Sequence, residues 1–167
     1  MAIPQTVPSA GVEVKGGAKE IVTGGVVAGI IGGMLMAMIM MMATAAGGMG
    51  FLAPLRLIAA TVYGGEAMTG GGPLIVGLMI HMMNSMVFGV IFAWIVGRRP
   101  AAFPALMAGV AFGVAIWAVM TFGGLPMLNH LMRERVAMMP VAWFIAHVAF
   151  GMGVGSAPGL RHRFAAH

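Results

Sequence analysis

Residues 74–97 read LIVGLMIHMMNSMVFGVIFAWIVG and contain no charged side chain. A membrane-spanning helix needs about 20 mostly apolar residues to cross a hydrocarbon core of about 30 Å. Three further uncharged runs are long enough for one such helix each: residues 21–55, 100–132 and 136–160. Backbone polar groups in lipid must be satisfied within the chain, so runs of this length form helices. We expect membrane helices near residues 21–43, 74–97, 101–122 and 138–158.

The composition of the whole chain agrees with a membrane protein. Of the 167 residues, 60% are apolar and only 8% are charged, whereas an ordinary soluble domain has about 25% charged residues. So few charges argue against a soluble enzyme, a nucleic-acid binder and a disordered tail, and they make the lipid bilayer the expected partner. The chain has no cysteine, which excludes disulfides and thiolate metal sites.

The distribution of Lys and Arg predicts the orientation in the membrane. Residues 1–20 begin with two prolines and mixed charges, so we interpret them as a retained cytoplasmic segment and not a cleavable signal. Residues 21–158 form the transmembrane domain, and residues 159–167 form a tail. Six Lys/Arg fall on the side of the two termini and three on the other side. Cytoplasmic loops carry the excess of positive charge, so we expect a multi-pass protein of a prokaryotic inner membrane with both termini cytoplasmic.

The chain contains an internal repeat. The first and third expected helices share Ala-Gly followed by Gly four residues later, and the second and fourth share His followed by Gly eight residues later. These positions are Ala28, Gly29 and Gly33 with Ala108, Gly109 and Gly113, and His81 and Gly89 with His147 and Gly155. We expect two similar helical hairpins in the same orientation, related by an axis along the membrane normal.

Small residues recur at every fourth position in all four expected helices. This spacing lets membrane helices approach closely and associate without a hydrophobic driving force. The fold class is therefore all-α, an integral membrane four-helix bundle. The glycines expected at its helix contacts are Gly29, Gly33, Gly89, Gly109, Gly113, Gly151 and Gly155.

The two connections on the outer side also have helical patterns. In residues 126–136, Met127, Leu128, Leu131 and Met132 fall on one helical face, with Asn129 on the opposite face. This pattern predicts a short amphipathic helix lying on the membrane surface. Residues 54–62 are its weaker counterpart.

Two histidines lie within the expected membrane helices. His81 and His147 are at matched depth, and ionisable residues inside a membrane are candidates for function. Uncharged imidazoles can hydrogen-bond across a helix interface, where Asn84 and Ser85 could join them. Alternatively, the two histidines could be axial ligands of a haem b, line a quinone or lipid pocket, or relay protons. No cofactor is favoured on the residues alone.

Methionine is abundant, with 20 residues in the chain. Met34, Met38 and Met42 form a stripe at helical spacing, and thioethers are soft ligands that suit Cu(I). The same residues can also serve as flexible apolar filler between helices. A small copper transporter is therefore one alternative for the function.

The motifs resemble a known family. Gly77 with His81, an Ala-Gly-x₃-Gly helix that leads to Trp117, and His147 with Gly151 and Gly155 are its features. The chain resembles, over residues 22–158, small four-helix membrane proteins of bacteria and archaea classed as a domain of unknown function. The resemblance implies the four-helix architecture and marks the two histidines as family features, but it implies no activity. The methionine-rich first helix departs from that pattern.

The residues point to a non-enzymatic protein. No carboxylates pair within the expected helices, and Ser85 has only His81 nearby, without a third catalytic partner. We expect an accessory subunit that packs against other subunits of a larger respiratory or photosynthetic electron-transport complex. The alternatives are a haem b or quinone protein using the two histidines, and a metal transporter.

Overall fold

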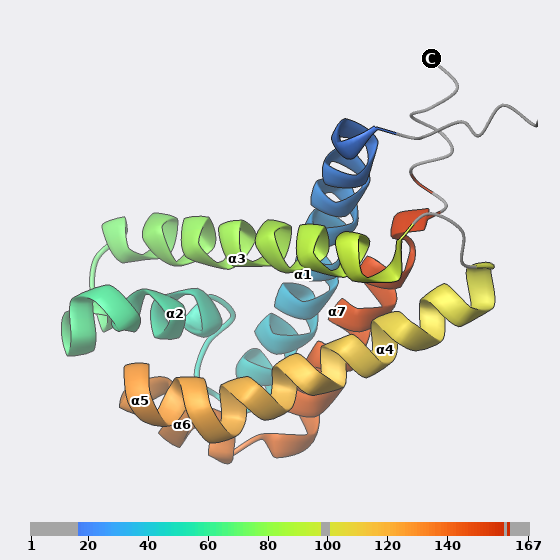
Figure 1. Ribbon diagram of the computed structural model, residues 1–167. Coiled ribbons are helices and arrows are strands. Elements are labelled where there is room, and N and C mark those ends of the chain that lie inside the picture. Colours follow the sequence, from blue (N-terminus) through green and yellow to red (C-terminus); the bar gives the residue numbers. More distant parts are fainter. Residues whose placement is uncertain (1–16, 98–100, 159, 161–167) are drawn as a thin grey trace, which may run out of the picture.

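All secondary structure in the described part of the chain is helical. The computed structural model describes residues 17–97, 101–158 and 160 (Figure 1). The elements are α1 (Ala18–Ala46), α2 (Ala53–Tyr63), the 3₁₀ helix η1 (Gly64–Met68), α3 (Gly72–Val96), α4 (Ala102–Val119), the π-helical turn η2 (Met120–Gly124), α5 (Leu125–Leu128), α6 (His130–Ala137) and α7 (Pro140–Gly155). The tails expected at 1–20 and 159–167 lie almost entirely outside the described residues.

Three segments are long and apolar enough to span a membrane. They are α1, α3 and the continuous helical stretch Ala102–Leu128. The fourth expected helix is divided, because α6 and α7 meet at a bend of 105° and are long and apolar enough to span a membrane only as a pair. The described residues therefore form an all-helical membrane protein with three candidate spans, or four if α6 and α7 together make one. A regular four-helix bundle is not confirmed.

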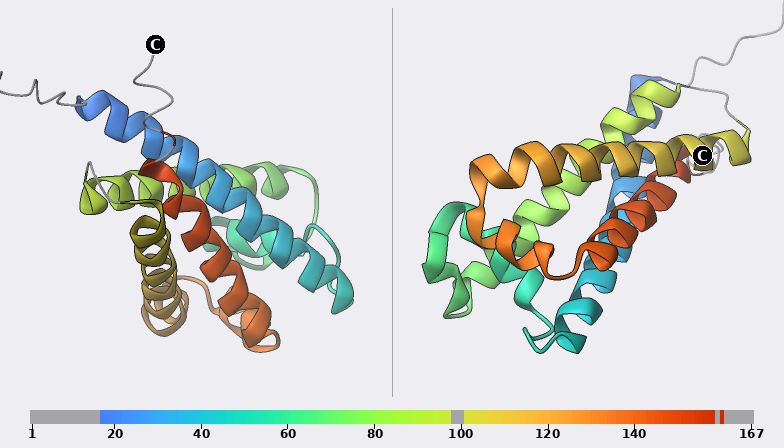
Figure 2. Two further views of the ribbon diagram at one scale, coloured as in Figure 1. Left: turned by 90° about the vertical axis from the view of Figure 1, so that its right-hand side faces the viewer. Right: turned by 90° about the horizontal axis from the view of Figure 1, so that it is seen from below.

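The long helices pair within each half of the chain. α1 packs against α3, α4 packs against α7, and the contact between α1 and α7 joins the two pairs. Figure 1 shows that α3 crosses α1 and does not run along it, and Figure 2 shows α1 and α7 side by side. At the joint, a Cβ atom on Gly32 would lie 2.7 Å from the Phe150 carbonyl oxygen, so glycine is needed there for close approach.

Glycines allow the close contact where α1 crosses α3. A Cβ atom on Gly29 would collide with the carbonyl oxygen of Ser85, and one on Gly33 would lie 2.5 Å from Ser85 Oγ and 3.6 Å from His81 Nε2. The helices can cross at this distance only because these positions carry no side chain.

The crossing of α4 with α7 repeats the close approach of a glycine to a backbone carbonyl. A Cβ atom on Gly109 would collide with the carbonyl oxygen of Gly151, and one on Gly113 would collide with that of His147. Gly109 and Gly151 thus take the places of Gly29 and Ser85. Gly113 lies against a backbone carbonyl, whereas Gly33 lies against the Ser85 side chain and the His81 ring. The internal repeat in the sequence corresponds to a repeat of helix contacts.

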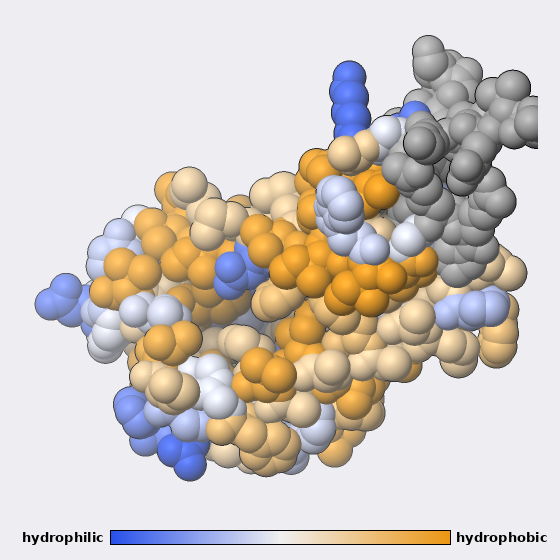
Figure 3. All heavy atoms as spheres, viewed as in Figure 1, coloured by the Kyte–Doolittle hydropathy of each residue, from blue (hydrophilic) through white to orange (hydrophobic). Residues whose placement is uncertain are grey.

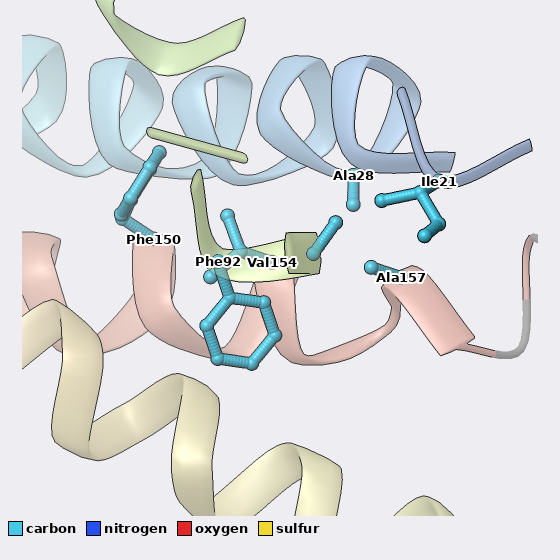
Figure 4. Packing of buried hydrophobic residues seen from close by; sticks show 7 residues of the cluster. Ile21, Ala28, Phe92, Phe150, Val154 and Ala157 are labelled. Atoms are coloured by element: carbon cyan, nitrogen blue, oxygen red, sulfur yellow. The ribbon is translucent and has the colours of Figure 1, made fainter. Parts of the chain in front are cut away.

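A buried apolar cluster fills the junction of the two pairs. Phe92 of α3 lies against Phe112 of α4, with ring centroids 5.4 Å apart. Figure 4 shows the side chains from α1, α3, α7 and the residues after α7 that gather there. The labelled members are Ile21, Ala28, Phe92, Phe150, Val154 and Ala157.

The second outer connection differs from the expected amphipathic helix. The backbone breaks at Asn129, with φ −154° and ψ 81°, so α5 and α6 do not share one helical face. Met127 and Leu128 before the break are exposed, whereas Met132 after it is buried. Asn129, expected on the polar face, is buried and caps α6. The assignment of these residues to a single surface helix is therefore wrong, because an Asn N-cap begins a new helix there.

Candidate functional site

A cavity of about 270 Å³ lies between the two helix pairs. Its lining residues come mainly from α3 and α7, with others from α1, α2, α4, η2, α5 and α6. The face seen in Figure 3 is hollowed between α3 and the helices drawn below it. Most of its wall is apolar, and its polar side chains are Thr61, His81, Asn84, Ser85, Asn129 and His147.

His81 reaches the cavity from the middle of α3. Its Nε2–H donates to the carbonyl oxygen of Gly33 on α1 at 2.9 Å. A carbonyl oxygen can only accept, so Nε2 carries the ring proton and Nδ1 of the uncharged ring has a lone pair. One turn later, Ser85 Oγ donates to the carbonyl oxygen of His81 at 2.8 Å. This histidine therefore links two helices by its own hydrogen bond.

His147 reaches the same cavity from α7 and is only 1% exposed. Its Nδ1–H donates to the carbonyl oxygen of Trp143 in the same helix at 2.8 Å. The Trp143 ring packs edge-on against the imidazole, with centroids 4.2 Å apart, and its Nε1–H donates to Thr121 Oγ1 at 2.9 Å. These contacts fix the ring orientation and leave Nε2 with a lone pair and no hydrogen bond within the described chain.

Asn129 ties the two outer connections together beneath the cavity. Its amide nitrogen donates to the Leu57 carbonyl oxygen at 2.8 Å and to Thr61 Oγ1 at 2.9 Å, both on α2. Its Oδ1 accepts from the Met132 backbone N–H at 2.9 Å. Asn129 has thus used both of its amide protons for structure, and it holds α2 against α6.

Asn84 is the exception among the polar side chains of the wall. It lies at the centre of α3, is exposed, and makes no hydrogen bond with any described residue. An unpartnered amide at this position in a membrane-spanning helix is unfavourable, because lipid offers it no hydrogen-bond partner. It lies at the mouth of the cavity, where a bound molecule or water can reach it.

The expected metal ligands are not brought toward this site. Met34, Met38 and Met42 are 56%, 57% and 62% exposed on the outer face of α1. Three other methionines line the cavity instead: Met36, Met120 and Met132. Among the described residues, no group of three or more His, Asp or Glu side chains is placed to hold a metal ion.

The seven glycines expected at helix contacts are all buried, each against a neighbouring helix: Gly29, Gly33, Gly89, Gly109, Gly113, Gly151 and Gly155. Trp117 packs edge-on against Phe122 and Phe144. Its Nε1–H is buried and has no partner among the described residues.

Sequence reasoning did not find the roles of Trp143 and Asn129 or the π-helical turn. For Asn129 a signal exists, because Asn is among the preferred N-cap residues and Met132 N–H lies three residues on. The π-helical turn at Met120–Gly124, which presents Met120 and Gly124 to the cavity, has no such signal in the sequence.

The comparison with known families covers almost all of the described fold. The profile of a family of unknown function, DUF6789, matches residues 19–163. The chain belongs to this family. The match spans both helix pairs and the cavity between them, and it confirms the expected resemblance to a domain of unknown function. The DUF6789 description names no activity, and nothing in it indicates catalysis. No curated protein and no solved structure matches the chain.

Proposed function

We propose that this DUF6789 protein binds a small, mostly apolar molecule by its polar head group in the cavity between the helix pairs. One observation carries the proposal. An apolar cavity of about 270 Å³ brings together hydrogen-bonding atoms of His81, Asn84 and His147 that no described residue uses. Ligand sites are typically apolar hollows of about 300–1,000 Å³ with a few placed polar groups, and this cavity lies just below that range, as suits a small head group.

The position of the cavity favours entry from the bilayer. The cavity is open beside the exposed Asn84, and its wall includes α3 and the stretch Ala102–Leu128, which are both candidate spans. A gap between two spans faces hydrocarbon, so a molecule dissolved in the membrane can enter head first. A tail longer than the cavity would remain in the lipid. A quinone-type molecule, with a polar ring and an apolar tail, has this shape.

Two alternatives from the sequence fit the site less well. Ligation of a haem through His81 Nε2 would require breaking its hydrogen bond to Gly33, whereas only His147 has Nε2 unused. The copper transporter interpretation rested on Met34, Met38 and Met42, whose side chains point away from the cavity. A role as an accessory subunit of a larger membrane complex stays a prediction, and copurification of other subunits in mild detergent is its test.

The binding proposal is tested with 4-octylphenol as the probe. Ligand that binds only the folded state raises its stability, so the thermal unfolding midpoint of the detergent-purified protein should rise with probe concentration. Ile80→Trp on the cavity wall should abolish this rise by filling the space. Ile75→Trp, one and a half turns earlier on the exposed face of α3, is the matched control and should retain it. Equal responses of the two variants would contradict the cavity as the site.

We also propose a topology of four crossings with both termini cytoplasmic. The excess of Lys/Arg on the side of the termini supports it, and an even number of crossings requires α7 to be the fourth. Labelling of a cysteine introduced at residue 167, in the otherwise cysteine-free chain, tests it. A membrane-impermeant thiol reagent should label this cysteine only after the cells are opened. Labelling in intact cells would contradict the orientation.

A further inference from the structure

We propose that the cavity selects head groups that bring a hydroxyl proton, such as a hydroquinone or phenol, over head groups that only accept, such as a quinone. This inference rests on the proposed function and specifies its ligand. The inference follows from the hydrogen bonds that the buried polar side chains already donate to the protein.

Every buried polar side chain of the cavity wall donates its protons to the protein itself. His81 donates to Gly33 O, Ser85 to His81 O and His147 to Trp143 O. Asn129 gives both amide protons to α2. When the two imidazoles are uncharged, these buried side chains have no free proton to donate, and only their lone pairs can hydrogen-bond to a ligand. None of the described residues that line the cavity is acidic or basic apart from the two histidines.

His147 Nε2 is the acceptor best placed for a hydroxyl. The ring is held by the Trp143 carbonyl oxygen and by the edge-on Trp143 indole, so its orientation is fixed before a ligand arrives. Because the residue is 1% exposed and lines the cavity, a ligand in the cavity is the partner that can reach it. A preorganised acceptor loses little freedom on binding, which favours affinity.

Asn84 at the mouth contributes little to this selection. Its amide and the hydroxyl of Thr61, the other exposed polar side chain of the wall, each offer both a donor and an acceptor, so they can pair with a second oxygen of either kind. Discrimination therefore arises at the buried end, where a quinone carbonyl would face lone pairs. Sites built to hydrogen-bond a hydroxyl reject analogues that lack it strongly, because buried polar groups are then left unpaired.

The test compares 4-octylphenol with 4-octylanisole, which has the same ring and tail but a methyl ether in place of the hydroxyl. Binding to the purified full-length protein is measured by equilibrium dialysis in detergent, and Ile80→Trp reports uptake by micelles alone. We expect the phenol to bind at least tenfold more tightly than the anisole. The pair 2-octyl-1,4-benzohydroquinone and 2-octyl-1,4-benzoquinone, the first kept reduced by dithionite, should show the same order.

Substitutions of His147 assign the acceptor. His147→Phe should bring phenol and anisole affinities within about twofold of each other, with anisole binding retained. His147→Gln, whose amide oxygen can accept, should restore part of the preference. Unchanged thermal unfolding without ligand shows that both variants are folded. If His147→Phe does not fold, the phenol preference of His147→Gln is compared with that of the wild type instead.

The outcomes separate this inference from the proposed function. Equal binding of phenol and anisole by the wild type, or tighter binding of the quinone, overturns the hydroxyl preference and leaves the cavity as a binding site. Failure of all four compounds to bind overturns the proposed function itself. A full phenol preference in His147→Phe overturns the assignment of the acceptor to His147.

Discussion

The two helix crossings share a backbone arrangement and differ in how they use their histidine. At the α1–α3 crossing the His81 ring proton bridges to Gly33 on the other helix, and Ser85 supplies a hydroxyl beside it. At the α4–α7 crossing His147 keeps its proton within its own helix, and Gly151 stands in the place of Ser85. The repeat thus conserves the close approach of backbones but not the hydrogen bonds.

This difference separates two roles for equivalent residues. His81 contributes to the attachment of α3 to α1, so it has a structural bond to lose. His147 contributes no bond between helices among the described residues, and Trp143 only fixes its orientation. His147 is buried against Trp143 but makes no hydrogen bond to another helix, so its Nε2 is available to a ligand. The comparison predicts that changes to the shared backbone contacts act alike in both crossings, while changes to the histidines do not.

The largest effect is expected from the glycines that both crossings share. Gly29→Ala and Gly109→Ala each place a Cβ atom onto a carbonyl oxygen of the partner helix, where only backbone movement can relieve the collision. Overpacking of this kind costs about 1–3 kcal/mol. Thermal unfolding in detergent should show losses of similar size for the two variants, because their surroundings are equivalent.

Gly123→Ala is the control for the glycine pair. A Cβ atom at Gly123 would meet nothing within 4 Å, and alanine is the better helix former, so this variant should be as stable as the wild type or slightly more stable. A tolerated Gly109→Ala together with a destabilised Gly29→Ala would show that the two crossings are not equivalent.

A smaller effect is expected where the two outer connections meet. Asn129→Ala removes the N-cap of α6 and both hydrogen bonds to α2. Loss of an N-cap alone costs about 0.5–2 kcal/mol. Asn84→Ala, which breaks no hydrogen bond among described residues, is the matched control and should be as stable as the wild type or slightly more stable. An Asn129→Ala protein as stable as the control would mean that the halves are held together without this residue.

The sequence predicts the long helices and the glycine contacts because both depend on local rules. Length and lack of charge define a span, and small residues four apart define a helix contact. The cavity cannot be predicted from such local rules. The 105° bend between α6 and α7 and the π-helical turn before α5 are not predicted from the sequence, and at Asn129 the local N-cap signal competes with a continuous apolar helical pattern. The equivalence of His81 and His147 could be predicted from their spacing. The acceptors of their ring N–H groups could not be predicted, since each depends on which carbonyl oxygen lies nearest in the folded chain.

The smallest expected effect distinguishes the two histidines. His81→Leu removes the bond to Gly33 across the crossing, and the net contribution of such a hydrogen bond is about 0.5–1.5 kcal/mol. His147→Leu removes only a bond within α7, so its unfolding midpoint should stay close to that of the wild type. For ligand binding we expect the opposite order of effects. His147→Leu should lower the affinity for 4-octylphenol more than His81→Leu does, because it removes the proposed acceptor of the hydroxyl. Both leucines approximate the volume of imidazole, which limits cavity effects. If the two variants lose stability equally and bind the phenol equally, the histidines have one common role, and the difference between the crossings has no functional meaning.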